Sequence, residues 1–139
     1  ISKEHIDELL DIHKTKGLSP ETLLNEAKSK KSIFHDFFDW EDKIAGDKWR
    51  LQQARVFINE VKVFINEKEI SLFENIQVQI NTEQSSRFYL PILEILNNEE
   101  QREQLIKKAI HEIEYWKMKY SQLTELKPIF KTIEKLKLK

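Results

Sequence analysis

Residues 33–40 read Ile-Phe-His-Asp-Phe-Phe-Asp-Trp and form the densest apolar patch of the chain. Three of the four large aromatic side chains in this segment, Phe34, Phe37 and Phe38, fit one face of a single helical turn. A longer helix is expected to follow over residues 40–60, because apolar residues recur there at helical spacing. This segment therefore predicts a hydrophobic nucleus that joins the N-terminal helices.

Two helices are expected before the aromatic segment. Ser2 is a candidate N-cap for a helix over residues 3–15, and Gly17 is its natural stop because glycine tolerates positive φ. Ser19-Pro20 is typical of a new helix start, since Ser caps well and Pro suits the first helical position. Residues 1–60 are thus predicted to form a helical N-terminal region.

The spacing of apolar residues changes after this region. Val61, Val63 and Ile65 alternate with other side chains, and alternation resumes over residues 70–80 after a short turn. A period of two with β-branched residues predicts an antiparallel hairpin over residues 61–81. A polar loop is expected to follow it, up to residue 87.

The C-terminal part is predicted to be helical. Pro91 can open a short helix, and a long helix is expected over residues 99–126. We expect Pro128 to end that helix by excluding Lys127 from the α region, and a short final helix to follow over residues 129–136.

Together these features predict a mostly helical α+β protein with N-terminal helices, a central antiparallel β-hairpin and a long C-terminal helix. A chain of 139 residues buries enough surface to fold without disulfides. We expect one domain over residues 1–139, made of a helical subregion (1–60), the hairpin (61–81) and the C-terminal helices (91–139).

The composition excludes several classes of protein. With no cysteine, the chain has no disulfide scaffold, thiolate metal site or cysteine nucleophile. Two glycines argue against phosphate-binding loops. No apolar run approaches the ~20 residues of a membrane span, and no signal peptide opens the chain at Ile1, so we expect a cytoplasmic protein without a membrane partner. Whether residues precede Ile1 is left open.

The charge of the chain is unevenly distributed. Residues 1–60 and residues 61–98 each carry a net charge of −2, whereas residues 99–139 carry +3. A field that would attract nucleic acid over the whole protein is therefore absent, but a local basic patch is not excluded.

Residues 5–31 have features of a helix-turn-helix, with Gly17 in the turn. Lys16 stands where an apolar residue is usual, and Glu21 and Glu26 in the second helix would repel phosphate. In this alternative, nucleic acid would be contacted by the hydroxyl of Thr22, by lysines after the second helix and by lysines of the basic C-terminal tail. The lysines are Lys28, Lys30, Lys31, Lys127, Lys131 and Lys135. A generic helix joint explains the same segment.

The acidic residues and histidines give no strong sign of catalysis. His35 with Asp36 and Asp39 is the one locally suggestive set for a metal, and an exposed polar turn explains it more simply. Known nucleophile and nucleotide-binding motifs are absent. We expect no enzyme activity, catalytic residue, cofactor or metal; a hydrolase or nuclease that uses Asp39, Glu41 and Asp42 is the weaker alternative.

The sequence resembles a family of uncharacterised phage- and prophage-encoded proteins. The pattern consists of an aromatic-His segment and an acidic turn after Trp within residues 33–42, and a helix that ends in Arg-x-x-Gln-Ala-Arg at residues 50–55. Tyr89-x-Pro91 and a helix with Trp116-x-x-x-Tyr120-x-x-Leu123 resemble the same group, whereas Gly46 stands where the pattern has Ala. The resemblance implies a phage or mobile-element origin, hence the host cytoplasm, and no particular chemistry.

The central pattern predicts both packing and ion pairs. The expected aromatic cluster consists of Phe34, Phe37, Phe38, Trp40 and Trp49. Arg50 and Arg55 are expected to pair with acidic side chains of the preceding turn, namely Asp39, Glu41 or Asp42. A functional alternative makes Arg50, Gln53 and Arg55 a polar interaction strip that faces a ligand.

The long amphipathic helix and the absence of catalytic motifs predict a non-catalytic accessory protein, and the resemblance implies that it belongs to a phage or mobile element. It would act through protein–protein interaction or self-association, so the expected partner is a protein or a second copy. The alternative is a DNA-binding regulator that uses residues 5–31 and the basic tail, with nucleic acid as the partner.

Overall fold

A computed structural model describes residues 1–41 and 46–137. It confirms the α+β class, with N-terminal helices, antiparallel strands in the middle of the chain and a long helix near the C-terminus. The chain divides into two compact units, residues 1–97 and 98–139, which are described separately below. The organisation of the chain as a single domain stays a prediction.

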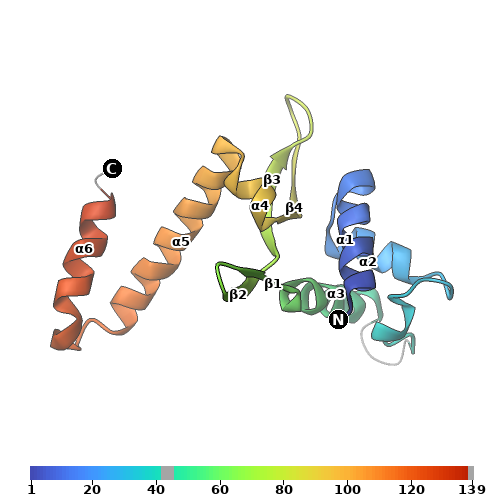
Figure 1. The fold of residues 1–139 in the computed structure, drawn as a ribbon, viewed down its shortest axis with the longest axis horizontal. Coiled ribbons are helices and arrows are strands. Elements are labelled where there is room, and N and C mark those ends of the chain that lie inside the picture. The colour runs from blue at the N-terminus through green and yellow to red at the C-terminus, as the bar shows by residue number, and fades with distance from the viewer. Residues whose placement is uncertain (42–45, 138–139) are drawn as a thin grey trace. The chain divides into compact units, whose positions relative to one another are not determined.

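The first unit contains four helices of the α type, one 3₁₀ turn and four strands among its described residues (Figure 1). In chain order these are α1 (Lys3–Lys16), α2 (Pro20–Ala27), η1 (His35–Phe37), α3 (Gly46–Glu60), β1 (Lys62–Ile65), β2 (Lys68–Ser71), β3 (Phe73–Gln79), β4 (Ser85–Pro91) and α4 (Ile92–Leu96).

The joint between α1 and α2 forms as the local signals predict. Ser2 caps α1 in a capping box with His5, and Gly17 ends the helix with a φ of +79°. Ser19 caps α2 in a second capping box with Thr22, and Pro20 occupies the first turn. Each helix end is therefore satisfied by residues next to it in the sequence.

The aromatic segment and α3 supply much of the core of this unit. Phe34 and Phe38 are buried, and the ring of Phe57 on α3 lies 5.6 Å from the ring of Phe34 in an edge-on contact. Phe57 is not part of the cluster that the sequence predicts. Together these rings join η1 and α3 to the apolar faces of α1 and α2.

The helix expected over residues 40–60 begins later than predicted. Trp40 and Glu41 are not helical, and the first described helical residue is Gly46. The indole nitrogen of Trp40 donates to the carbonyl of His35 at 2.8 Å, which holds Trp40 against the aromatic segment. The part of the prediction that covers residues 42–45 lies outside the described residues.

The antiparallel hairpin expected over residues 61–81 forms over residues 62–71, and a second hairpin that was not predicted follows it over residues 73–91. β1 pairs with β2 around Asn66 and Glu67, which both have positive φ, as in the two-residue turns that suit twisted strands. The backbone N–H of Leu72 then donates to the carbonyl of Val61, which closes this hairpin next to the end of α3. Residues after Leu72 therefore need another partner.

That partner is β4, whose first three residues, 85–87, belong to the predicted polar loop. β3 and β4 pair antiparallel, with Phe73 opposite Pro91 and Gln79 opposite Ser85. Ser85 and Arg87 give this strand its polar character, and the Arg87 guanidinium donates to the side-chain oxygen of Asn75 across the pair at 2.6 Å. The strand was missed because its pairing is non-local and one face is exposed.

The second hairpin is fixed to the joint between the first two helices. The N–H of Tyr89 donates to the carbonyl of Leu18 at 2.6 Å, which adds a short bridge to the edge of β4. Pro91 opens α4 as expected, and Ile95 on that helix is fully buried. The bridge protects the edge of β4 from pairing with another chain at this position.

The second unit contains α5 (Glu99–Lys119), the 3₁₀ turn η2 (Thr124–Leu126) and α6 (Lys127–Lys137). The rings of Trp116 and Phe130 meet with centroids 5.6 Å apart near the turn that joins the two long helices. Phe130 is the one buried hydrophobic residue among the described residues of this unit. α5 itself has no buried residue.

The predicted boundaries of the C-terminal helices are wrong. The long helix ends at Lys119 and not near residue 126, because Tyr120 leaves the helical conformation with its ring packed against Trp116. Lys127 is helical, with φ −49° and ψ −43°, and Pro128 lies in the first turn of α6. Proline is tolerated there because the N–H groups of the first helical turn have no acceptor within the helix, so the N–H that proline lacks is not needed.

We predict that Gly17→Ala lowers the free energy of unfolding by about 2 kcal/mol. A Cβ atom at this position would lie 2.5 Å from a ring carbon of Phe88, and the φ of +79° is unfavourable for any L side chain. Urea unfolding gives the difference directly. Asn25→Ala on the exposed side of α2 is the control and should change stability by less than about 0.5 kcal/mol. Equal unfolding midpoints for the two variants would contradict the prediction.

Candidate functional site

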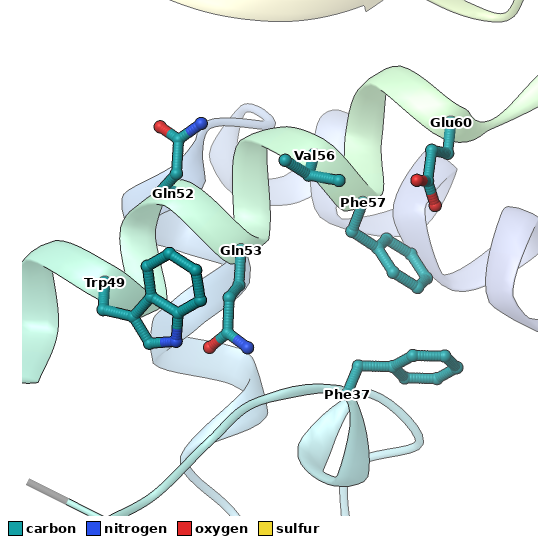
Figure 2. A pocket seen from close by; sticks show the side chains of 7 residues that line it. All are labelled: Phe37, Trp49, Gln52, Gln53, Val56, Phe57 and Glu60. Atoms are coloured by element: carbon teal, nitrogen blue, oxygen red, sulfur yellow. The ribbon is translucent and has the colours of Figure 1, made fainter. Parts of the chain in front are cut away.

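The side of α3 that turns away from the core forms an open groove. Arg50, Ala54 and Ile58 face the interior at helical spacing, which leaves the opposite side of the helix to line the surface. The groove has a volume of about 320 Å³. We call it the α3 groove, and it is lined by Phe37, Trp49, Gln52, Gln53, Val56, Phe57 and Glu60 (Figure 2).

The α3 groove is mostly apolar. Figure 2 shows Trp49, Gln53 and Phe57 pointing from α3 toward the segment that carries Phe37. The rings of Phe37 and Phe57 lie 4.8 Å apart at 65°, and His5 of α1 contacts Phe37 edge-on at 5.1 Å. One side of the groove is therefore formed by aromatic rings that pack against one another and against α1.

Three large apolar side chains of the α3 groove remain accessible. Phe37, Trp49 and Val56 are 44%, 47% and 45% exposed, respectively. Polar groups occur along its rim, with the amides of Gln52 and Gln53 and the carboxylate of Glu60. This arrangement of apolar centre and polar rim is typical of protein-binding surfaces.

A layered contact next to the groove fixes the aromatic segment on α3. The ring of His35 stacks on Trp40 at 4.8 Å and 11°, and the guanidinium of Arg50 lies over the Trp40 ring at 5.3 Å. Arg50 is only 8% exposed. We call these three residues the Arg50 stack; its cation–π contact is strengthened by removal from water.

The polar partners of Arg50 explain why it can be buried. Its Nη2 and Nε donate to one carboxylate oxygen of Asp47 at 2.9 and 3.2 Å, and Nη1 donates to the backbone carbonyl of Asp39 at 3.2 Å. The expected ion pair therefore forms with Asp47, which sequence analysis did not consider, while Asp39 contributes its carbonyl. Asp42, another expected partner, lies outside the described residues.

The predicted interaction strip is only partly brought together. The side-chain oxygen of Gln53 accepts a hydrogen bond from the N–H of Asp39 at 3.2 Å, so Gln53 and Arg50 hold the same backbone segment. Arg55 is exposed, and its guanidinium is 3.5 Å from the amide oxygen of Gln52. A ligand-binding role for Arg50, Gln53 and Arg55 stays a prediction.

The expected aromatic cluster differs from the observed one at Trp49. Phe38 and Trp40 are in contact, with ring centroids 5.7 Å apart, and Phe34 and Phe37 each contact Phe57. Trp49 lines the α3 groove, where nearly half of its surface is exposed. Trp49 directly precedes Arg50, so it lies about 100° around the helix from the buried residues Arg50, Ala54 and Ile58.

The candidate metal and acidic residues are used in local structure. The Nδ1 atom of His35 lies 2.7 Å from the carbonyl oxygen of Ala27, and a side-chain oxygen of Asp39 accepts from the N–H of Glu41 at 3.1 Å. Within residues 1–41 and 46–137, no three His, Asp or Glu side chains are grouped so that they could hold a metal ion.

Residues of the helix-turn-helix candidate make hydrogen bonds that stabilise the joint between α1 and α2. The hydroxyl of Thr22 lies 2.8 Å from the Gly17 carbonyl, to which it donates, and it accepts from the N–H of Ser19 at 2.9 Å. Glu21 is exposed on α2, and Glu26 forms an ion pair with Lys16 of α1. The outer side of α2 is therefore acidic.

The remaining nucleic-acid candidates are exposed lysines in two separate places. Three of them follow α2, and three are on α6 in the second unit: Lys28, Lys30, Lys31, Lys127, Lys131 and Lys135. Contact of these lysines with nucleic acid stays a prediction. None of the helices in the described part of the chain is long and apolar enough to cross a membrane.

No protein family, curated protein or solved structure matches the chain. The function must therefore be inferred from the chemistry of its own surfaces.

We predict that Arg50→Met lowers the free energy of unfolding by about 1–2 kcal/mol, because it removes the bonds to Asp47 and to the Asp39 carbonyl but keeps an apolar stem over Trp40. Thermal or urea unfolding measures the loss. Arg55→Met is the matched control on the same helix, with an expected change of less than about 0.5 kcal/mol. A larger loss for the Arg55 variant than for the Arg50 variant would refute this account of the stack.

Proposed function

We propose that this protein is a non-catalytic accessory protein of a phage or mobile element, and that it acts by binding a protein partner, either a second copy or another chain. The observation that carries the proposal is the α3 groove, in which three large apolar side chains, two on α3 and one on η1, are each close to half exposed. Contiguous exposed apolar surface of this kind marks interaction sites on proteins.

The residue types of the groove suit protein binding. Tryptophan and other aromatic residues supply much of the binding energy at interfaces, especially where polar groups surround them. Trp49 and Phe37 occupy the accessible part of the α3 groove, and Gln52 and Glu60 lie among its polar lining residues. Because Phe37 packs against Phe57, little ordering entropy of its side chain remains to be lost on binding.

The same groove is poorly equipped for catalysis. Among its lining residues, Glu60 is the one that carries a carboxyl group, whereas the glutamine amides and the aromatic rings cannot act as general acids or bases. This favours binding over reaction at the groove. The weaker alternative, a hydrolase with dispersed carboxylates, gains no support from Asp39, since its side chain accepts a backbone hydrogen bond.

The DNA-binding alternative has less support than the protein-binding proposal. Thr22 is engaged in the helix joint, and the exposed Glu21 would face phosphate unfavourably if α2 entered a groove of DNA. The exposed lysines after α2 and on α6 keep this alternative open to test.

We predict that affinity capture with the tagged full chain, from cells that carry the source phage or element, recovers a protein partner that persists after nuclease treatment. Trp49→Ala should reduce the recovered partner by about tenfold or more, because an aromatic anchor at an interface is worth roughly 2 kcal/mol. Phe64→Ala, which removes an exposed aromatic side chain from β1 outside the groove, is the matched control and should leave recovery unchanged.

Sedimentation of the purified chain completes this test. A lone 16.7 kDa monomer together with no captured protein would count decisively against the proposal. Loss of all captured material after nuclease treatment would instead favour the DNA-binding alternative.

A further inference from the structure

The first turn of α1 is capped with the help of the imidazole of His5. A capping box usually has Glu or Gln at this position, and its side-chain oxygen accepts a hydrogen bond from the backbone N–H of the N-cap residue. Here the N–H of Ser2 donates to Nδ1 of His5 at 3.0 Å, and the Oγ of Ser2 lies 2.8 Å from the same nitrogen. In return, the N–H of His5 donates to the Oγ of Ser2 at 3.4 Å. The capping box therefore depends on a ring nitrogen as acceptor.

The direction of this hydrogen bond defines the protonation state of His5. A backbone N–H can only donate, so the Nδ1 atom that faces the N–H of Ser2 must hold a lone pair and no proton. The ring is therefore neutral in this geometry, with its proton on Nε2. A protonated imidazole donates from both nitrogens and would point an N–H at the N–H of Ser2.

The same imidazole belongs to the aromatic wall of the α3 groove. The ring of His5 meets Phe37 edge-on at 5.1 Å and Phe57 edge-on at 6.3 Å, and it also contacts the buried Phe34 at 5.8 Å. Phe37 and Phe57 line the groove. The bond to Ser2 fixes the orientation of the His5 ring, and so it also fixes the surface against which Phe37 packs.

The charged side chains around His5 leave its ring bonded to Ser2. By element they are Glu4, Asp7 and Glu8 on α1, Asp36 on η1, Glu60 on α3, and Lys62 and Glu69 of the first hairpin, which line a neighbouring hollow with Ile1 and its amino group. In the part of the chain that the structure describes, Ser2 is the one hydrogen-bond partner of the imidazole.

Protonation of His5 has two physical consequences. A positive charge at the N-terminal end of α1 is disfavoured by the helix dipole, and the acceptor for the Ser2 N–H is lost. The surrounding phenyl rings attract a cation, however. We therefore expect the protonated ring to turn away from Ser2 and to stay within the aromatic wall, where its new orientation changes the packing of Phe37.

We propose that His5 makes the α3 groove sensitive to pH. The neutral imidazole holds Phe37 in place, whereas protonation breaks the bond to Ser2, turns the ring and weakens binding of the partner. Histidine changes its charge between about pH 5 and pH 8, so the contact is present above this range and lost below it. The binding step rests on the proposed function, because it describes a regulation of the same groove.

NMR spectroscopy of the full chain without a partner tests the structural step. Long-range proton–nitrogen correlation spectra at neutral pH should show the proton of the His5 ring on Nε2. On acidification, the ring protons of Phe37 should shift with the same midpoint as His5. His5→Gln keeps a capping acceptor but cannot be protonated, so it should abolish this dependence. His111→Gln, at an exposed residue of α5, is the control and should retain it.

Affinity capture at two pH values tests the binding step. The probe is the nuclease-resistant protein that the tagged chain captures and that Trp49→Ala loses. The wild type should recover about two- to tenfold less of it near pH 5.5 than near pH 7.5, which corresponds to the loss of one hydrogen bond. His5→Gln should recover equal amounts at both pH values. Circular dichroism of each variant verifies that the helices are retained.

Three results would overturn the proposal: a proton on Nδ1 of His5 at neutral pH, Phe37 signals that do not follow His5, or equal recovery of the captured protein by the wild type at both pH values. Phe37 signals that change only near about pH 4, where carboxyl groups titrate, would assign the effect to Asp36 or Glu60 and also overturn it.

These outcomes are distinct from failure of the proposed function. If Phe37 follows His5 but no captured protein depends on Trp49, the proposed function is wrong and the coupling of His5 to the groove stands. If a captured protein depends on Trp49 and its recovery is independent of pH, the groove binds a protein and the regulation is wrong.

Discussion

The burial of Arg50 against Trp40 is the contact on which the rest of the first unit depends. A guanidinium can leave water only when its donors are satisfied, and here Asp47 and the carbonyl of Asp39 provide acceptors while Trp40 covers its face. The ring of His35 also stacks on the indole. The aromatic segment is thereby fixed to α3 by a polar and an aromatic contact at once.

This constraint decides which aromatic rings are buried and which are displayed. With Trp40 held beside His35, the 3₁₀ turn of residues 35–37 places Phe34 and Phe38 in the core and leaves Phe37 at the surface. Phe57 supports Phe37 from α3. The α3 groove therefore follows from the way the aromatic segment packs on α3. Because Phe34 and Phe38 fill the core, Phe37 stays at the surface of the groove.

Local features of the fold could be predicted from the sequence, whereas non-local ones could not. Ser2, Gly17 and Ser19-Pro20 act through neighbouring backbone groups, so their capping and stopping roles are visible in the chain itself. The strand over residues 85–91 is defined by its pairing with β3 and by the bridge from Tyr89 to Leu18, partners far away in sequence. The end of α5 at Lys119 carries no glycine or proline signal in the sequence, and Tyr120 leaves the helical conformation without one.

The same distinction applies to the candidate site. Arg50, Gln53 and Trp49 were recognised as notable residues, but the sequence could not show that Arg50 and Gln53 bind the backbone of Asp39 while Trp49 stays at the surface. Phe57 was overlooked between Val56 and Ile58, since only the fold reveals that it faces the aromatic segment. Site residues that act through tertiary contacts are therefore the ones that spacing alone does not identify.

The central claim is that the α3 groove is a binding surface that a protein partner covers. Amide hydrogen exchange of the full chain, free and bound to its partner, measures this cover without any substitution. We predict that exchange slows on binding in residues 49–60 and stays constant in the hairpin of residues 62–71. Exchange in residues 49–60 that is unchanged in a sample that sedimentation shows to be associated would contradict the claim.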